Sequence, residues 1–177
     1  MAFKDLALKD IIVATQADLR DNPEHANAIF AADSRQVDGL RSETKISQFS
    51  LTIDEPPNLG GTDTGPNPVE LVLAALATCQ EITYRAYATA LGIPLDSVRV
   101  ELEGDLDLRG FFAVDDSVRP GYGAIRGTVH LVSSADRETL EQLRQAVNAH
   151  CPVLDIVANP VPVQLDIAIE RKTSKAA

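Results

Sequence analysis

The sequence is poor in the residues that build metal sites and disulfide frameworks. Its 177 residues include only two cysteines, Cys79 and Cys151, and three histidines, His25, His130 and His150. Apart from the adjacent His150 and Cys151, no two of these residues have the spacing of a metal-binding pair. We therefore expect neither a bound metal nor another cofactor.

The sequence also lacks a long apolar run and an excess of basic residues. The longest apolar stretch, residues 69–77, is interrupted by Glu70 and is too short to span a bilayer, and residues 1–8 show no secretory signal. Acidic residues outnumber basic ones by 26 to 16, and the net charge of −10 repels nucleic acid and anionic lipid. We expect a cytoplasmic protein with neither nucleic acid nor membrane as a partner.

What remains is an ordinary globular composition, with 45% apolar and 24% charged residues. A chain of this length fits one domain, so we expect a single domain over residues 1–177, with residues 1–26 as an N-terminal helical extension. Paired cysteines in a reducing compartment are more often catalytic, redox-sensing or metal-binding than structural. Two unrelated buried cysteines are the alternative reading of the composition.

Periodicity and turn residues place the elements of the first third of the chain. Helical spacing from Leu8 to Leu19 predicts a helix that Asn22-Pro23 ends. Residues 27–37 read as a strand, followed by a turn at Asp38-Gly39 and a second strand over residues 45–53. The loop over residues 54–66 is rich in Pro and Gly, and loops of this length are often functional.

The best-marked element is a helix over residues 67–91. Asn67 at the N-cap, Pro68 at the first helical position and Glu70 three residues after the cap predict a capping box. The residues that follow are apolar on nearly every side, which predicts a helix buried all round and wrapped by sheet. Further along, alternation and caps predict the strands 98–108, 125–132 and 161–169 and the helices 135–149 (capped by Ser134) and 152–158. The class is α+β with antiparallel sheets.

Each cysteine has a local argument for reactivity. Cys79 lies where the apolar helix turns polar, at Gln80 and Glu81, and this change suits the wall of a pocket. Cys151 precedes Pro152, so we expect it at the N-cap of a short helix, where unpaired N–H groups and a protonated His150 stabilise a thiolate. The competing readings are a buried structural thiol for Cys79 and a small residue at a helix corner for Cys151.

Two motifs together resemble the OsmC/Ohr family. The run from Gly65 to Leu71 matches the segment that opens the central helix of that family, with the first catalytic cysteine, here Cys79, about three turns later. Cys151-Pro152 looks like its second motif, and the Gly-rich loop is most similar to the OsmC-like branch. The resemblance implies the OsmC-like fold, antiparallel sheets wrapped around a long central helix, in an intertwined homodimer.

The resemblance also implies a thiol peroxidase for organic hydroperoxides. Cys79 attacks the peroxide, Cys151 resolves the sulfenic acid as a disulfide, and a dithiol such as a lipoyl group reduces it. In the family a catalytic Glu follows the Asn-Pro directly, whereas here Val69 has that place and Glu70, the candidate for the catalytic carboxylate, comes one residue later. The family's catalytic arginine corresponds to Arg35 or Arg41. The alternative is a non-enzymatic protein of this fold that binds a small apolar ligand or senses oxidants through its thiols.

Overall fold

The computed structural model describes residues 3–170 of the chain. Its helices and strands, in chain order, are α1 (Phe3–Asp21), β1 (Ala32–Asp38), β2 (Arg41–Ile46), β3 (Phe49–Ile53), α2 (Pro68–Leu91), β4 (Ser97–Leu106), α3 (Leu108–Phe111), β5 (Tyr122–Val132), α4 (Arg137–His150) and α5 (Pro152–Ala158). Short 3₁₀ turns cover Pro23–Ala26 and Pro57–Leu59. No helix within the described range is both long and apolar enough to cross a membrane.

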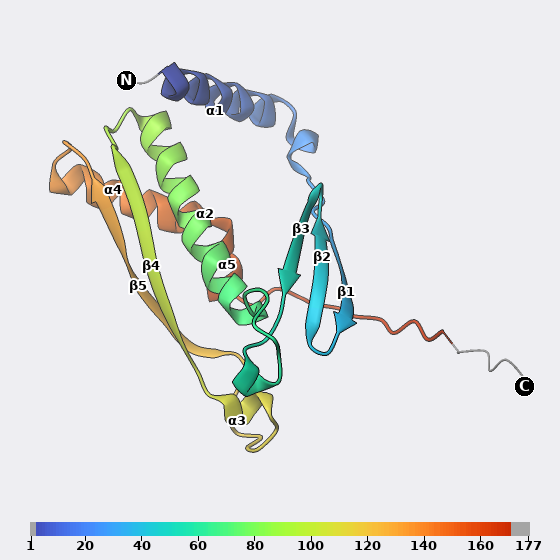
Figure 1. The fold of residues 1–177 in the computed structure, drawn as a ribbon. Helices are drawn as coiled ribbons and strands as arrows, with labels where there is room; N and C mark the ends of the chain where they lie inside the picture. Colours follow the sequence, from blue (N-terminus) through green and yellow to red (C-terminus); the bar gives the residue numbers. More distant parts are fainter. Residues whose placement is uncertain (1–2, 171–177) are drawn as a thin grey trace, which may run out of the picture.

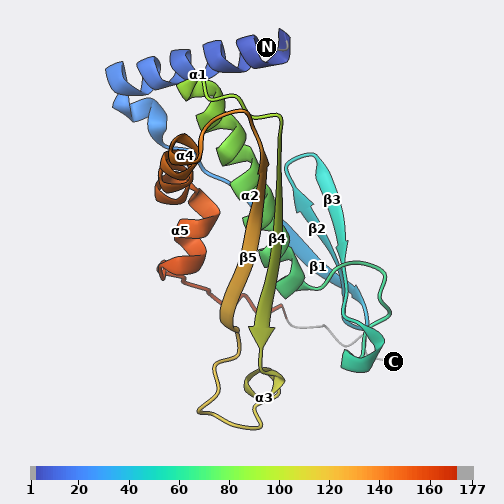
Figure 2. The same cartoon turned by 90° about the vertical axis from the view of Figure 1, so that its left-hand side faces the viewer.

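The elements form an α+β fold around α2, as the sequence predicts (Figure 1). β4 and β5 pair antiparallel from Ser97–Val132 to Leu106–Tyr122 and lie along one side of α2. α4 and α5 pack on another side of α2, and α1 crosses its C-terminal end (Figure 2). The antiparallel sheet β1–β2–β3 forms a separate layer that packs chiefly on itself.

Two of the sequence-predicted strands in the N-terminal half are corrected. The strand expected at residues 27–37 begins only at Ala32, and Ile29 and Phe30 before it are almost fully exposed. The stretch 45–53, read as one strand, is the end of β2 and all of β3, joined by a tight turn in which Ser47 adopts a φ of 54°. That turn carries neither Gly nor Pro, so its signal in the sequence is weak. The hairpin predicted at Asp38-Gly39 is present, but its turn residues are Gly39 and Leu40, and Asp38 is the last residue of β1.

α2 begins and ends where its capping residues predict. The Asn67 side chain accepts from the Glu70 N–H, and the Glu70 carboxylate accepts from the Asn67 N–H, which completes the capping box. Gly92 closes the helix in the left-handed conformation that glycine favours. The expectation that α2 is buried all round is wrong for the single chain, because Ile82 is 68% exposed and Val72 is also exposed.

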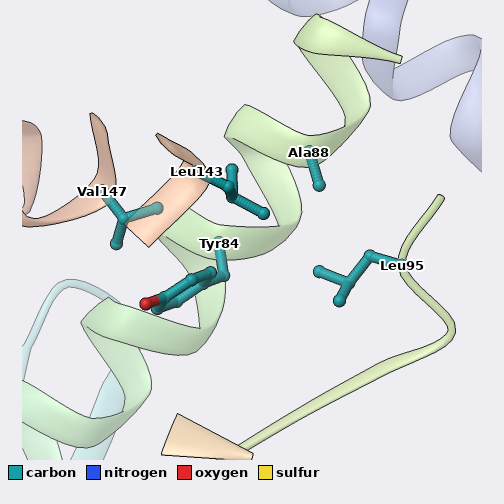
Figure 3. Packing of buried hydrophobic residues seen from close by; sticks show 5 residues of the cluster. All are labelled: Tyr84, Ala88, Leu95, Leu143 and Val147. Carbon is teal, nitrogen blue, oxygen red and sulfur yellow. The ribbon is translucent and has the colours of Figure 1, made fainter. Parts of the chain in front are cut away.

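A compact apolar cluster fixes the C-terminal half of α2. Tyr84 and Ala88 of α2 meet Leu143 and Val147 of α4, with Leu95 closing the third side (Figure 3). Leu143 and Val147 are the inward positions that the helical period predicts, and both are completely buried. The cap of α4, however, is Asp136 rather than Ser134, because the Asp136 carboxylate accepts from the Thr139 N–H.

The strand expected at residues 161–169 has no pairing partner in the described part of the chain. The segment is extended and exposed along its whole length, and Leu165 is 88% exposed. The segment therefore has the alternating apolar pattern of a strand, but it pairs with no sheet among the described residues of the chain. The neighbouring helix α5 does follow the prediction, opening at Pro152 and ending at Ala158.

A buried carboxylate organises the Gly- and Pro-rich loop that leads into α2. Asp54 is 1% exposed, and its oxygens accept hydrogen bonds from the backbone N–H groups of Glu55, Thr62 and Thr64 and from the two threonine hydroxyls. These hydrogen bonds, with that of the Thr62 hydroxyl the largest, hold the pKa of Asp54 well below its usual range. The loop is thus folded around one ionised side chain.

This arrangement predicts a specific response to acid. Because the pKa of Asp54 is lower in the folded than in the unfolded chain, its stabilising effect is complete above the ordinary aspartate pKa of about 4 and fades as pH falls below it. We expect Asp54→Asn to unfold at lower urea than the parent at pH 7, and to lose less stability than the parent between pH 5 and pH 3. Asp63→Asn, at an exposed left-handed position that Asn tolerates, is the matched control and should behave like the parent. Equal urea midpoints for Asp54→Asn and the parent at pH 7 would contradict the role of Asp54.

Candidate thiol site

The structure brings the two cysteines together from positions 72 residues apart. The Sγ atoms of Cys79 and Cys151 lie 3.4 Å from each other, and both are free thiols. Cys79 is half-buried on α2, whereas Cys151 is 1% exposed at the junction of α4 and α5. The expectation that the two sulfurs lie near disulfide reach is confirmed.

The local sequence explains why Cys151 points at α2. α4 ends at His150, and Pro152 opens α5, so that Cys151 has an extended backbone between two helices. Both helices pack on α2, and the corner between them therefore faces it. Cys151 has the N-cap position that the sequence predicts, although its side chain makes no capping hydrogen bond and faces Cys79 instead.

The surroundings of Cys79 favour the neutral thiol within one chain. Burial raises the pKa of the Cys79 thiol and the adjacent Cys151 thiol raises it further, while the backbone N–H of Val153 and the hydroxyl of Thr83 act in the opposite direction. No cationic side chain is among the groups that shift this pKa. Among residues 3–170, the chain therefore supplies the pair of sulfurs but no positive charge that lowers the pKa of Cys79.

The other predicted site residues lie elsewhere. Glu70 serves the capping box, about 13 Å along the axis of α2 from Cys79 at about 1.5 Å per residue. Arg35 is exposed on β1, and Arg41 is half-buried at the start of β2. The Nε atom of Arg41 is buried without a hydrogen-bond partner among the described residues. Neither arginine lies on an element that packs against α2 or α5.

The sequence predicts that a protonated His150 stabilises a Cys151 thiolate, but the structure gives the His150 ring other partners. Its Nδ1 lies 2.8 Å from the carbonyl oxygen of Ala146, to which it donates, and its ring is tilted against that of Tyr87. Over the described range, no three or more metal-ligating side chains form a group that could hold a metal ion. Sequence reasoning missed the Val153 N–H and gave Thr83 no role. Thr83 is signalled only by its place one helical turn after Cys79, where its hydroxyl donates to the Cys79 carbonyl oxygen.

The closeness of the sulfurs predicts an intrachain disulfide. On treatment with a mild thiol oxidant such as diamide, we expect both thiols to be lost together, without covalent dimers on a denaturing gel. Cys151→Ser serves as the control. Its one remaining thiol, that of Cys79, has no intrachain partner, so no intrachain disulfide can form. Disulfide-linked dimers as the main product of the parent protein would contradict the geometry.

Three comparisons with known proteins agree with this fold. The family model of OsmC-like proteins matches residues 61–166, which include both cysteines. The uncharacterized protein YmaD of Bacillus subtilis is 22% identical over 153 residues, covering 86% of this chain and 97% of its own length.

Solved structures of low sequence identity share the architecture. An OsmC-like protein from Mycoplasma pneumoniae superposes with a TM-score of 0.66 at 16% identity, over 76% of this chain and 90% of its own. An organic hydroperoxide resistance protein OsmC from Legionella pneumophila gives a TM-score of 0.58 at 20% identity, over 73% and 89%. With the family model spanning more than half of the sequence, this chain belongs to the OsmC-like protein family.

Proposed function

We propose that this chain is a thiol peroxidase that reduces organic hydroperoxides through Cys79 and Cys151. The observation that carries the proposal is the 3.4 Å separation of two free thiols contributed by α2 and the α4–α5 corner. Membership of the OsmC-like family supports it, as does the structural likeness to a Legionella pneumophila protein named for organic hydroperoxide resistance. The mostly apolar helix α2 suits a substrate with a hydrocarbon body.

The chemistry needs two thiols and an external dithiol. The Cys79 thiolate attacks one oxygen of the O–O bond, the bond breaks, and the other oxygen leaves as an alcohol after taking up a proton. Cys79 is then a sulfenic acid. The Cys151 thiolate attacks its sulfur, which forms the disulfide and releases water. A dithiol, for example a lipoyl group, regenerates both thiols by two exchange steps and is itself oxidised to a disulfide.

Exposure supports Cys79 as the attacking residue. Cys79 is half-buried and Cys151 is almost completely buried, so a peroxide reaches Cys79 first. The sequence places Cys151 at the start of α5, a position that stabilises a thiolate. However, α5 has only seven residues, and the N–H of its Val153 lies against the Cys79 sulfur. The same N–H stabilises a Cys79 thiolate.

The activating charge comes, in this proposal, from a second copy of the chain. The sheet β1–β2–β3, which carries Arg35 and Arg41, forms a layer of its own (Figure 1) and is not among the elements that pack on α2 or α5. Exposed apolar side chains on α2, among them Ile82, supply a surface for the homodimer. The unpaired, buried Nε of Arg41 favours Arg41 over Arg35 for this role.

Single-cysteine variants test the assignment of the two thiols. With cumene hydroperoxide and a dithiol reductant, Cys79→Ser should lose turnover altogether, because no other thiol is placed to attack. Cys151→Ser should consume about one equivalent and then stop as a sulfenic acid that dimedone traps. Mass spectrometry after one equivalent of peroxide reads the modified residue. Oxidation of Cys151 in the Cys79→Ser protein would reverse the two roles.

Mixed dimers test whether the arginine acts across the subunits. Neither Cys79→Ser nor Arg41→Ala should turn over appreciably alone, whereas dimers formed by refolding the two together should regain activity. In such a dimer, one site combines an intact Cys79 with the intact Arg41 of the other copy. Arg35→Ala in place of Arg41→Ala gives the matched comparison. Activity that does not return with either arginine variant would contradict an arginine shared between copies.

A thiol sensor is the second candidate, and two observations favour it. The raised pKa of Cys79 and the Val69 at the family's Glu position both slow attack on a peroxide. A sensor would lose its two thiols once per chain and would show no repeated turnover with excess dithiol. Steady-state turnover therefore separates the two functions.

A further inference from the structure

The two thiols form a site with two donor atoms. The Sγ atoms of Cys79 and Cys151 lie 3.4 Å apart, and both thiols are free. Among residues 3–170, no further cysteine, histidine or carboxylate joins them in a group that could hold a metal ion. Zinc takes four protein ligands in its structural sites, so the pair by itself does not suit zinc. The site instead suits an atom that prefers sulfur and needs only two bonds from the protein.

The packing of the helices presets the separation of the sulfurs. Tyr84 of α2 and Val147 of α4 belong to one buried cluster, and each lies within five residues of a cysteine (Figure 3). In a disulfide the sulfurs are about 2.05 Å apart, so this pair must move together before it can form one. A single atom bonded to both sulfurs holds them farther apart than a disulfide does. Such a ligand therefore binds with little rearrangement of the helices.

Trivalent arsenic meets these requirements. Thiol sulfur is a soft ligand, and arsenic in this state bonds to it strongly. In a monosubstituted arsenical such as phenylarsine oxide, one of the three arsenic valences is already used by carbon, which leaves two for thiols. The reaction consumes thiols together with their protons and needs no positive charge beside the sulfur. This agrees with a site in which burial raises the pKa of Cys79 and no cationic side chain lowers it among the described residues.

We propose that Cys79 and Cys151 together bind one trivalent, monosubstituted arsenical per chain. Two As–S bonds replace the bonds between arsenic and oxygen, and the two thiol protons leave with that oxygen as water. Arsenic stays trivalent and neither sulfur is oxidised, so the step differs from the reaction with a hydroperoxide. Cys79 reacts first, because it is half-buried whereas Cys151 is 1% exposed. The bound arsenical blocks both thiols, whether or not the chain reduces peroxides.

Titration with phenylarsine oxide, read by mass spectrometry of the intact denatured chain, tests this site. We expect one phenylarsenic group per chain and the loss of both thiols to a maleimide probe. Excess 2,3-dimercaptopropanol should release the group and restore both thiols, whereas glutathione at the same thiol concentration should leave it bound. No adduct, two groups per chain, or an arsenic atom that joins two chains would each overturn the proposal. Because the readout is a mass, a protein without peroxidase turnover would still give the expected result.

Single-cysteine variants are the matched controls. Cys79→Ser and Cys151→Ser each keep one thiol, and each should bind the arsenical on the order of 100-fold more weakly than the parent, because the second As–S bond is lost. Affinity equal to that of the parent in either variant would contradict a site made by both sulfurs. Circular dichroism checks that the variants are folded. Where one is not, the parent oxidised until no maleimide-reactive thiol remains replaces it, and an arsenic adduct on that form would equally overturn the proposal.

Discussion

The thiol site of this chain depends on the packing of α2 against the helices α4 and α5. Tyr84 and Ala88 on one helix, and Leu143 and Val147 on the other, form a core with almost no exposed surface. Because these helices pack together in this way, the corner that holds Cys151 faces α2, and the Cys151 sulfur lies against that of Cys79. The thiol pair is therefore a consequence of the core rather than of any contact between the cysteines.

The N-terminal end of α2 is fixed by polar interactions instead. The capping box starts the helix, the ionised Asp54 ties down the loop before it, and the hydroxyl of Tyr122 donates to the carbonyl oxygen of Val69. These bonds set the helix against β5 as well as against its own loop. Because both ends of α2 are held, the cysteine between them is positioned without any bond of its own to the sheet.

The same chain leaves large apolar surfaces uncovered. Part of α2, the sheet β1–β2–β3 and the segment after α5 all expose large apolar side chains. The electrostatics of the site are similar, since no cationic side chain among the described residues lowers the pKa of Cys79. The arginine proposed to come from a second copy would supply the missing charge.

The sequence alone determined the elements that have local signals. Asn67, Pro68, Glu70 and Gly92 bound α2 by hydrogen bonding and backbone conformation within a few residues, and the helical period of α4 marked Leu143 and Val147 as core. The two motifs around Cys79 and Cys151 resemble a family, and the family match confirms that reading.

Only the tertiary structure decided which of these elements face each other. The exposure of Ile82 and the absence of residues 161–169 from both sheets depend on contacts between distant parts of the chain. Alternation shows that a strand has two faces but not which edge it joins, because every sheet edge offers the same backbone groups. For that reason the residues of this segment alone do not determine which sheet edge, if any, it joins.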